Sequence, residues 1–303
     1  MGDWVTERLA EPGAAVFIFA ADAMAAYGIE SLGVTHGRPR TRPQFLQLLR
    51  EFVADGAIDG LLMTPADAEV LALDEKLFEH SPVTPIVRMN AETGIWNPRF
   101  GSYRGQHSLP FPVLPLADAG FCESVAACRV GIGLYSLTLD NDVAHDDAVL
   151  QAYLRFAREV GRAQNFAHFL EVFLPNTNRR GMSDEQCGAY VADSIARLSS
   201  YLRRAERPLL IKTEYTAPKI WRQLCDFDPT LRIGALGGPR QGPRQTLLLA
   251  HEVVKNGGRA VLFGRTIFEE DDPLAMARAL RRVLDGKATP DQAHDGYRQA
   301  LKS

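Results

Sequence analysis

The sequence of 303 residues lacks the features that mark several specialised classes of protein. Its longest uninterrupted apolar run, residues 14–21, is less than half as long as a membrane-spanning helix requires. Acidic side chains stand near the N-terminus, where a secretory signal has a basic start and an apolar stretch. The formal net charge is −3, and no long Lys/Arg block occurs. We therefore expect a soluble cytoplasmic protein with neither a nucleic-acid partner nor a membrane partner.

The residues that usually hold metals or cofactors are also sparse. The four cysteines form no C-x-x-C pair, and the seven histidines form no H-x-H or H-E-x-x-H motif. There is no P-loop and no G-x-S-x-G elbow. We expect free thiols in a reducing compartment, no metal and no cofactor.

The regular pattern of the chain is an alternation of short apolar runs with amphipathic stretches. Eight runs are rich in β-branched and other apolar residues, and most are continuous, as strands covered on both faces should be. They are residues 14–22, 58–64, 84–90, 129–137, 166–173, 207–215, 231–238 and 259–265.

The stretches between these runs predict helices over 42–56, 146–163, 183–205, 243–258, 272–286 and 290–302. Ser183 and Asp146 are the expected N-caps of two of them, and the Gly257-Gly258 pair is expected to end another. Eight strands that alternate with helices or long connections predict a single (β/α)8 TIM barrel over residues 1–303, with closing helices at the C-terminus. A doubly wound open sheet is the competing fold. It favours G-x-G-x-x-G after the first strand, where this chain has ADAMAAYG.

One segment does not follow the alternation. Residues 95–115 are rich in Pro, Gly and aromatic side chains, which predicts a long loop insertion after the third strand. This loop is a candidate for substrate recognition or for contact with a neighbouring subunit, and we expect a homo-oligomer.

Polar residues gather at the ends of the apolar runs, where barrel enzymes carry their chemistry. Lys212 is the most specific candidate among them because it follows Leu209, Leu210 and Ile211 and shares a strand face with Glu214. An apolar surrounding favours the neutral amine, which can attack a carbonyl and form a Schiff base. The alternative is that Lys212 only pairs with an acid at the barrel mouth.

Other strand ends supply candidate partners for this lysine. Glu171 is a candidate general acid/base or a charge partner of Lys212, and Tyr135 is a candidate proton donor or a packing residue. Asp22 is placed to orient the lysine or to bind a substrate hydroxyl. Arg88 either meets an anionic substrate group or forms a salt bridge with Glu92 or Asp22.

The last two strands predict a phosphate site. Gly237 and Gly238 end the seventh strand, while Gly264 and Arg265 end the eighth. TIM barrels commonly bind phosphate with backbone N–H groups of these two loops. Glycine lets the backbone approach the anion, and arginine supplies positive charge.

These residues resemble the class I, Schiff-base aldolases of the tagatose-bisphosphate and archaeal-type fructose-bisphosphate aldolase superfamily, from about residue 14 to 286. LLIKTEY at 209–215 looks like the family's lysine strand, which would make Lys212 the imine-forming residue, and FLE at 169–171 looks like its "FLEP" strand. FAADAM at 19–24 looks like "AxDxR". ALGGPR and GGRAVLFGRTIF, within 235–268, resemble its phosphate-binding end.

The chain also departs from the family pattern at several positions. Gly131 stands where tagatose-type members have a lysine, Met24 replaces an arginine, and Leu236 replaces a serine of the phosphate turn. The archaeal-type tyrosine corresponds to Tyr135. These differences indicate a divergent member of the superfamily.

Two functions follow from the residues and the resemblance. The first is a metal-independent class I aldolase, a carbon–carbon lyase acting on a ketose phosphate or related anionic carbonyl compound. In it Lys212 forms the imine, Glu171 or Tyr135 moves protons, and the glycine turns and Arg265 hold the anionic group. The second is a non-catalytic barrel that binds a sugar phosphate as a regulator.

Overall fold

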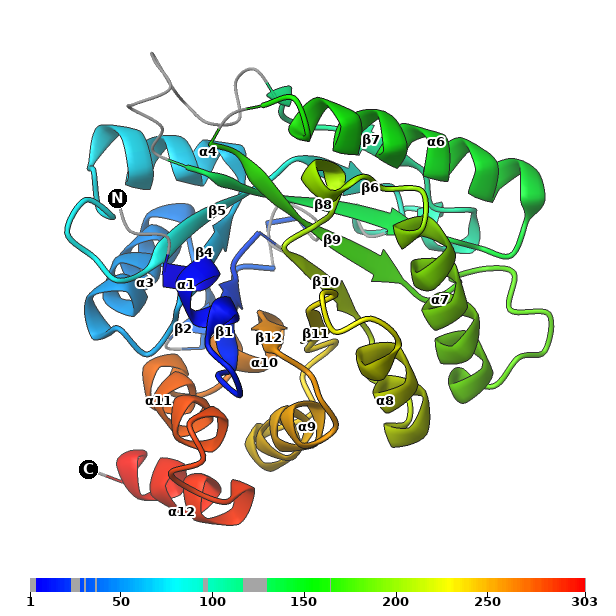
Figure 1. Ribbon diagram of the computed structural model, residues 1–303. Helices are drawn as coiled ribbons and strands as arrows, with labels where there is room; N and C mark the ends of the chain where they lie inside the picture. Colours follow the sequence, from blue (N-terminus) through cyan, green and yellow to red (C-terminus); the bar gives the residue numbers. More distant parts are fainter. Residues whose placement is uncertain are drawn as a thin grey trace.

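The computed structural model describes residues 4–22, 28–29, 31–35, 37–94, 98–116, 130–163 and 165–302. Eight parallel strands close into a barrel in which the last strand pairs with the first (Figure 1). In barrel order they are β1 (Val16–Ala20), β4 (Gly60–Met63), β5 (Thr84–Arg88), β8 (Ile132–Thr138), β9 (Ala167–Phe173), β10 (Leu210–Thr213), β11 (Ile233–Leu236) and β12 (Ala260–Phe263). The predicted TIM barrel is confirmed, and all eight predicted strands form. The open-sheet alternative is wrong, because the last of the eight strands pairs with the first.

Helices surround the barrel (Figure 1). They are α1 (Trp4–Ala10), α3 (Arg42–Asp55), α4 (Pro65–Ala68) with the π-helical η1 (Glu69–Asp74), α6 (Val143–Val160), α7 (Asp184–Ser199), η4 (Arg204–Glu206), α8 (Pro218–Phe227), α9 (Pro243–Lys255), α10 (Arg265–Phe268), α11 (Pro273–Leu284) and α12 (Pro290–Ala300). The six predicted helices all form. Helix α8, which buries Trp221 and Leu224, was missed, as were the short helices α1, α4 and α10.

Local capping explains where two of these helices begin. The Ser183 hydroxyl accepts a hydrogen bond from the Gln186 N–H at 3.3 Å, as predicted for the start of α7. The predicted cap Asp146 is wrong, because α6 starts earlier with Asp142 accepting from the His145 N–H at 3.0 Å. The Asp146 carboxylate instead accepts from the Asp140 N–H at 2.8 Å, and so ties the first turn of α6 to the end of β8.

Strand alternation divides the core into two layers. Phe17, Phe19 and other outward-facing residues pack against the helices, whereas Ile18, Leu62 and their inward-facing counterparts fill the barrel interior. Val5 and Leu9 of α1 join the interior cluster. Helix α1 thereby closes the N-terminal end of the barrel, so polar chemistry is confined to the opposite, C-terminal end.

The prediction of a long loop over 95–115 needs correction. The segment contains the 3-10 turn η2 (Tyr103–Gly105) and β7 (Pro110–Pro112), which pairs antiparallel with β6 (Asn90–Glu92). Strand β6 continues beyond β5 and lies against β8, whereas residues 95–97 lie outside the described residues. A further two-stranded ribbon joins β2 (Val34–Thr35) to β3 (Arg38–Pro39). The proline-rich composition concealed β7 because both of its ends are prolines.

Two remaining sequence observations can be followed in the described part of the chain. Cys187 and Cys225 are free thiols, whereas Cys122 and Cys128 lie outside the described residues. None of the described helices is both long and apolar enough to cross a membrane.

Candidate active site

Five polar residues from five of the eight barrel strands meet inside the C-terminal end of the barrel, and four of these strands (β5, β8, β9 and β10) are consecutive neighbours. Four of them are buried: Asp22 just after β1, Ser136 on β8, Glu171 on β9 and Lys212 on β10. The fifth is Arg88, the last residue of β5, whose side chain is 13% exposed. Parallel register places Ser136 beside Glu171 and Glu171 beside Lys212. Neighbouring strands therefore present these side chains at one level of the barrel.

Lys212 and Glu171 form the centre of this layer. The Lys212 Nζ lies 2.5 Å from the Glu171 Oε1, and both residues are at most 5% exposed. The pairing that the sequence left as an alternative role for Lys212 is therefore present. It also places a proton acceptor within direct reach of the amine, which a nucleophilic lysine requires.

Arg88 joins the lysine pair to the first strand. Its Nη2 lies 3.3 Å from the Glu171 Oε2, its Nη1 donates to the Ser136 hydroxyl at 2.8 Å, and its Nε donates to the Asp22 carboxylate. The predicted salt bridge between Arg88 and Asp22 is confirmed. Since three groups of this layer already occupy the guanidinium, Arg88 is placed to position them and not to project alone toward a substrate anion.

The charges in the layer set the protonation of its groups. Burial by itself raises the pKa of the Glu171 carboxyl, but the positive charges of Lys212 and Arg88 outweigh it, so the pKa is lowered. Burial likewise opposes the charge of Arg88, but Asp22 and Glu171 reverse the effect and raise the pKa of the guanidinium. Glu171 is thus an ionised carboxylate in direct contact with the Lys212 Nζ.

The structure corrects the expectation for Tyr135. Its side chain points out of the barrel and packs against the ring of Phe156 on α6, with ring centroids 4.7 Å apart. Burial raises its pKa to about 12. The packing alternative holds, because an odd–even shift along β8 puts Ser136, and not Tyr135, on the inward face. The Ser136 hydroxyl donates to Glu171 at 2.5 Å, a role that the sequence analysis missed.

Glu214 is not part of the lysine network. It follows β10, and burial raises the pKa of its carboxyl, while a hydrogen bond from the Leu174 backbone N–H and the charge of Arg179 oppose that rise. It also lines a small pocket between α7 and α8. Among the described residues, no hydrogen bond or ion pair joins Glu214 to Lys212.

The two glycine turns lie next to each other, as the phosphate-site prediction requires. They follow the paired strands β11 and β12. Gly238 has a φ of +65°, and a Cβ on Gly264 would come within 2.4 Å of the Ala20 carbonyl oxygen. A Cβ on Gly237 would lie 2.8 Å from the Thr266 Oγ1, a buried hydroxyl with no partner among the described residues. Arg265 starts α10 directly after Gly264.

A carboxyl that the sequence analysis named only as a possible partner of Arg88 lies one layer closer to the mouth. Glu92 on β6 is 1% exposed, and its Oε2 accepts hydrogen bonds from the hydroxyls of Ser108 at 2.9 Å and Thr138 at 3.0 Å. Its Oε1 has no partner in the described part of the chain. Burial raises the pKa of Glu92 to about 8, although the two hydroxyls and the charge of Arg88 oppose the rise.

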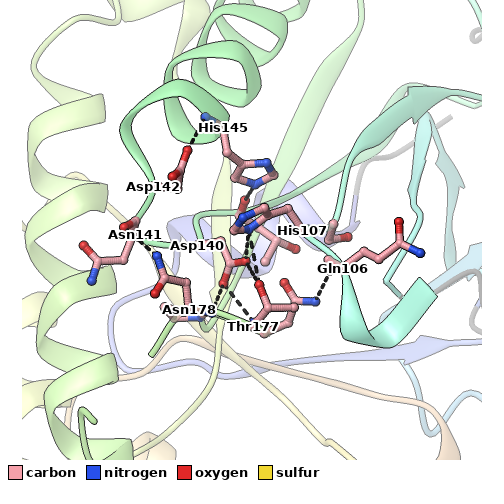
Figure 2. Close-up of polar contacts among 12 residues, drawn as sticks. Gln106, His107, Asp140, Asn141, Asp142, His145, Thr177 and Asn178 are labelled. Carbon is pink, nitrogen blue, oxygen red and sulfur yellow. Dashed lines mark hydrogen bonds and ion pairs between the residues drawn. The ribbon is translucent and has the colours of Figure 1, made fainter. Parts of the chain in front are cut away.

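Above this layer, a second polar cluster joins the loops that follow β8 and β9 (Figure 2). The buried Asp140 carboxylate accepts from the Thr177 and Asn178 backbone N–H groups, both at 3.0 Å, and contacts His107 and the Thr177 hydroxyl. The rings of His107 and His145 stack with centroids 5.1 Å apart. The cluster therefore anchors His107 and with it the adjacent Ser108, which contacts Glu92.

Two positions at which the sequence departs from the aldolase pattern, Gly131 and Met24, contribute no described side chain to this site. Gly131 lies just before β8, at the far end of the strand from Ser136, so a side chain there would not face the site. Met24 lies outside the described residues. Within the described ranges, no group of three or more His, Cys, Asp or Glu side chains is placed to hold a metal ion.

Comparison with solved structures shows the same fold in aldolases. An archaeal fructose 1,6-bisphosphate aldolase superposes with a TM-score of 0.67 at 16% identity, covering 94% of this chain and 100% of that one. A fructose-bisphosphate aldolase from Slackia heliotrinireducens gives a TM-score of 0.73 at 12% identity, covering 98% and 89%. The resemblance to class I aldolases seen in the sequence is confirmed at the level of the fold.

Comparison with curated sequences adds a shorter match. A 3-hydroxy-5-phosphonooxypentane-2,4-dione thiolase from Shigella flexneri is 34% identical over 88 residues, and its counterpart from Escherichia coli K12 is 30% identical over 88 residues. The first match covers 29% of this chain, and it spans only about a third (34%) of the thiolase's own length. No family model matches the sequence.

Proposed function

We propose that this protein is a class I aldolase, a carbon–carbon lyase that forms a Schiff base between Lys212 and a phosphorylated or otherwise anionic carbonyl compound. The observation that carries this proposal is the buried Lys212–Glu171 pair, with 2.5 Å between Nζ and Oε1, at the C-terminal end of a closed barrel. This is the end at which barrel enzymes place their reacting groups.

The first step is proton transfer from the Lys212 ammonium to Glu171. The free amine then attacks the carbonyl carbon, and the resulting carbinolamine loses water to become a protonated imine. Glu171 is suited to this exchange because its carboxylate already contacts the nitrogen. Ser136 and Arg88 hold the other Glu171 oxygen, at 2.5 Å and 3.3 Å, and keep the carboxylate oriented.

The protonated imine is the electron sink for cleavage of the carbon–carbon bond. When that bond breaks, its electron pair forms an enamine and the leaving fragment becomes an aldehyde. Carbonyl activation by the imine replaces the Lewis acid that a metal-dependent aldolase uses, so the proposed reaction is metal-independent. Asp22, held by Arg88, is placed near the same level of the barrel to bind a substrate hydroxyl.

The anionic end of the substrate would bind at the turns after β11 and β12. Backbone N–H groups near Gly237, Gly238 and Gly264 and the guanidinium of Arg265 are the proposed donors. Leu236 removes the hydroxyl that the family's serine offers. Thr266 carries a hydroxyl close to Gly237, and it would supply such a donor after a rotation of its side chain.

Trapping of the imine tests this proposal. Incubation with dihydroxyacetone phosphate, followed by borohydride, should add the mass of the reduced ligand to Lys212 and to no other lysine. Lys219, which follows Pro218 at the start of α8, is the internal control. An adduct confined to Lys219 or to surface lysines, or none with a panel of phosphorylated ketones, would contradict the proposed reaction.

The second candidate is a regulator that binds a sugar phosphate without turnover. The observation that favours it is the closed pairing of Lys212, Glu171, Arg88 and Asp22, which would also serve as a purely structural network. Binding of dihydroxyacetone phosphate in calorimetry without any borohydride adduct would identify this function.

A further inference from the structure

We infer that Glu92 is a second catalytic acid/base, which exchanges a proton with the substrate oxygen at the carbon–carbon bond being made or broken. This role rests on the proposed aldolase function and adds to it a residue and a step. The reaction needs such a residue because Tyr135, the other candidate proton donor, faces the helix layer and cannot reach the barrel interior.

The location of Glu92 follows from the alternation along β5 and β6. Arg88 points into the barrel, and positions 90 and 92 continue on the same side, closer to the mouth. Asn90 pairs with the backbone of Ser136, accepting from its N–H and donating to its carbonyl oxygen, both at 2.7 Å. This pairing holds β6 against β8, so that Glu92 reaches the inward-facing Thr138. A substrate attached to Lys212 must extend toward the mouth, past this level.

The bonding of the two glutamates assigns them different tasks. Both oxygens of Glu171 are occupied, by Lys212 on one side and by Ser136 and Arg88 on the other. Glu92 has both hydroxyl donors on Oε2 and keeps Oε1 free of partners among the described residues. A buried carboxyl with hydrogen-bond donors on only one of its two oxygens remains protonated at neutral pH, because burial disfavours the charged form. A proton donor must be protonated and must have an oxygen that is not already engaged, and Glu92 meets both conditions.

The proposed step balances as follows. In condensation, the enamine carbon attacks the aldehyde carbon, the imine reforms on Lys212, and the developing alkoxide takes the proton from Glu92, which is left as a carboxylate. In cleavage, the Glu92 carboxylate removes the proton from that hydroxyl while the carbon–carbon bond breaks and its electron pair enters the imine. A carboxylate with a raised pKa is a stronger base than an ordinary one, which suits removal of a hydroxyl proton.

The surroundings of Glu92 define its expected pH dependence. The titratable and charged groups near Glu92 or its hydrogen-bond donors are Arg88 on β5, Glu171 on β9, the outward-facing Tyr135 on β8, and His107, Asp140 and His145 beside Ser108 and Thr138. With a pKa of about 8, the condensation rate should fall as the pH rises through that value. The Ser108 hydroxyl stabilises the Glu92 carboxylate, so Ser108→Ala should move the fall to higher pH.

Glu92→Gln separates this role from imine formation. The glutamine amide oxygen can still accept from Ser108 and Thr138, but the side chain can donate no carboxyl proton. We expect borohydride adduct formation with dihydroxyacetone phosphate within about threefold of wild type, together with a fall of about 100-fold or more in condensation with glyceraldehyde 3-phosphate. The decline above pH 8 should disappear from the residual rate. Glu206→Gln, on η4 outside the barrel, is the matched control and should leave both rates unchanged.

Each other outcome is decisive. The assignment of Glu92 would be overturned if Glu92→Gln condensed at a rate within threefold of wild type. It would also be overturned if the condensation rate of Ser108→Ala fell at the same pH as that of wild type. Loss of the adduct in a folded Glu92→Gln protein, with wild-type thermal stability, would also overturn it by moving Glu92 to imine formation. A wild-type protein that forms the adduct but makes no carbon–carbon bond would refute the role of Glu92 alone. If the wild type forms no adduct at all, the proposed function itself fails.

Discussion

Replacing Arg88 with methionine removes the cation that links two buried carboxylates. Methionine keeps much of the apolar length of the arginine stem, so the main loss is the contacts to Asp22, Glu171 and Ser136. Removing one member of a buried ion pair costs about 3–5 kcal/mol. Because Glu171 keeps Lys212 at 2.5 Å, we expect the lower end of that range, about 3 kcal/mol, or roughly a 100-fold fall in the folded-to-unfolded ratio.

Urea unfolding at several pH values measures this loss and its origin. The pKa of Glu171 in the folded protein is lowered because the charges of Lys212 and Arg88 outweigh burial. Such a group stabilises the fold above its unfolded-state pKa, and the stabilisation disappears as the pH falls through the folded-state value. Without Arg88 the pKa of Glu171 is lowered less. The difference between wild type and variant should therefore be largest near pH 7 and should shrink below about pH 4.

Arg50→Met is the matched control. Arg50 pairs with Glu75 at 2.6 Å on the protein surface, where both side chains are 33% exposed. Exposed pairs contribute about 0–1 kcal/mol, so this variant should lose little stability. If Arg88→Met costs no more than Arg50→Met at pH 7, or if its cost does not change with pH, the buried network does not contribute to stability as argued.

Three further results are expected. Lys212→Arg should fold normally but form no borohydride adduct, because a guanidinium stays protonated; full activity of this variant would make Lys212 a charge partner only. Chelation with EDTA should leave aldolase activity unchanged, whereas loss of activity that added zinc restores would indicate a metal-dependent reaction. Asp140→Asn should lower the free energy of unfolding by about 1.5–3 kcal/mol in urea titrations. Burial opposes the ionisation of Asp140, but its hydrogen bonds from Thr177, Asn178 and His107 outweigh that and lower its pKa. The wild-type protein should therefore lose the stabilisation from the ionised Asp140 as the pH falls into the acid range. An Asp140→Asn variant as stable as wild type at pH 7 would refute this role of Asp140.

The fold could be predicted from the sequence because its signals are local. Each barrel strand is a continuous apolar run, and each of the longer helices carries an apolar stripe that needs no partner to be recognised. The same locality placed Asp22, Arg88, Glu171 and Lys212 correctly at the C-terminal ends of their strands. The pairing of Lys212 with Glu171 follows from the adjacency of β9 and β10, which consecutive strands of a barrel normally have.

The sequence could not decide which residues of a strand face the barrel interior. Alternation gives two possible sets, and nothing local shows which set points inward. A shift of one residue along β8 exchanges Tyr135 for Ser136, and both are plausible strand-end residues in sequence. The environment of Glu92 was equally hidden, because its hydrogen-bond donors Ser108 and Thr138 are 16 and 46 residues away. Tertiary packing alone buries that carboxyl with one oxygen unpartnered, since burial and long-range hydrogen bonds depend on which segments meet, and no local pattern of residue types encodes that.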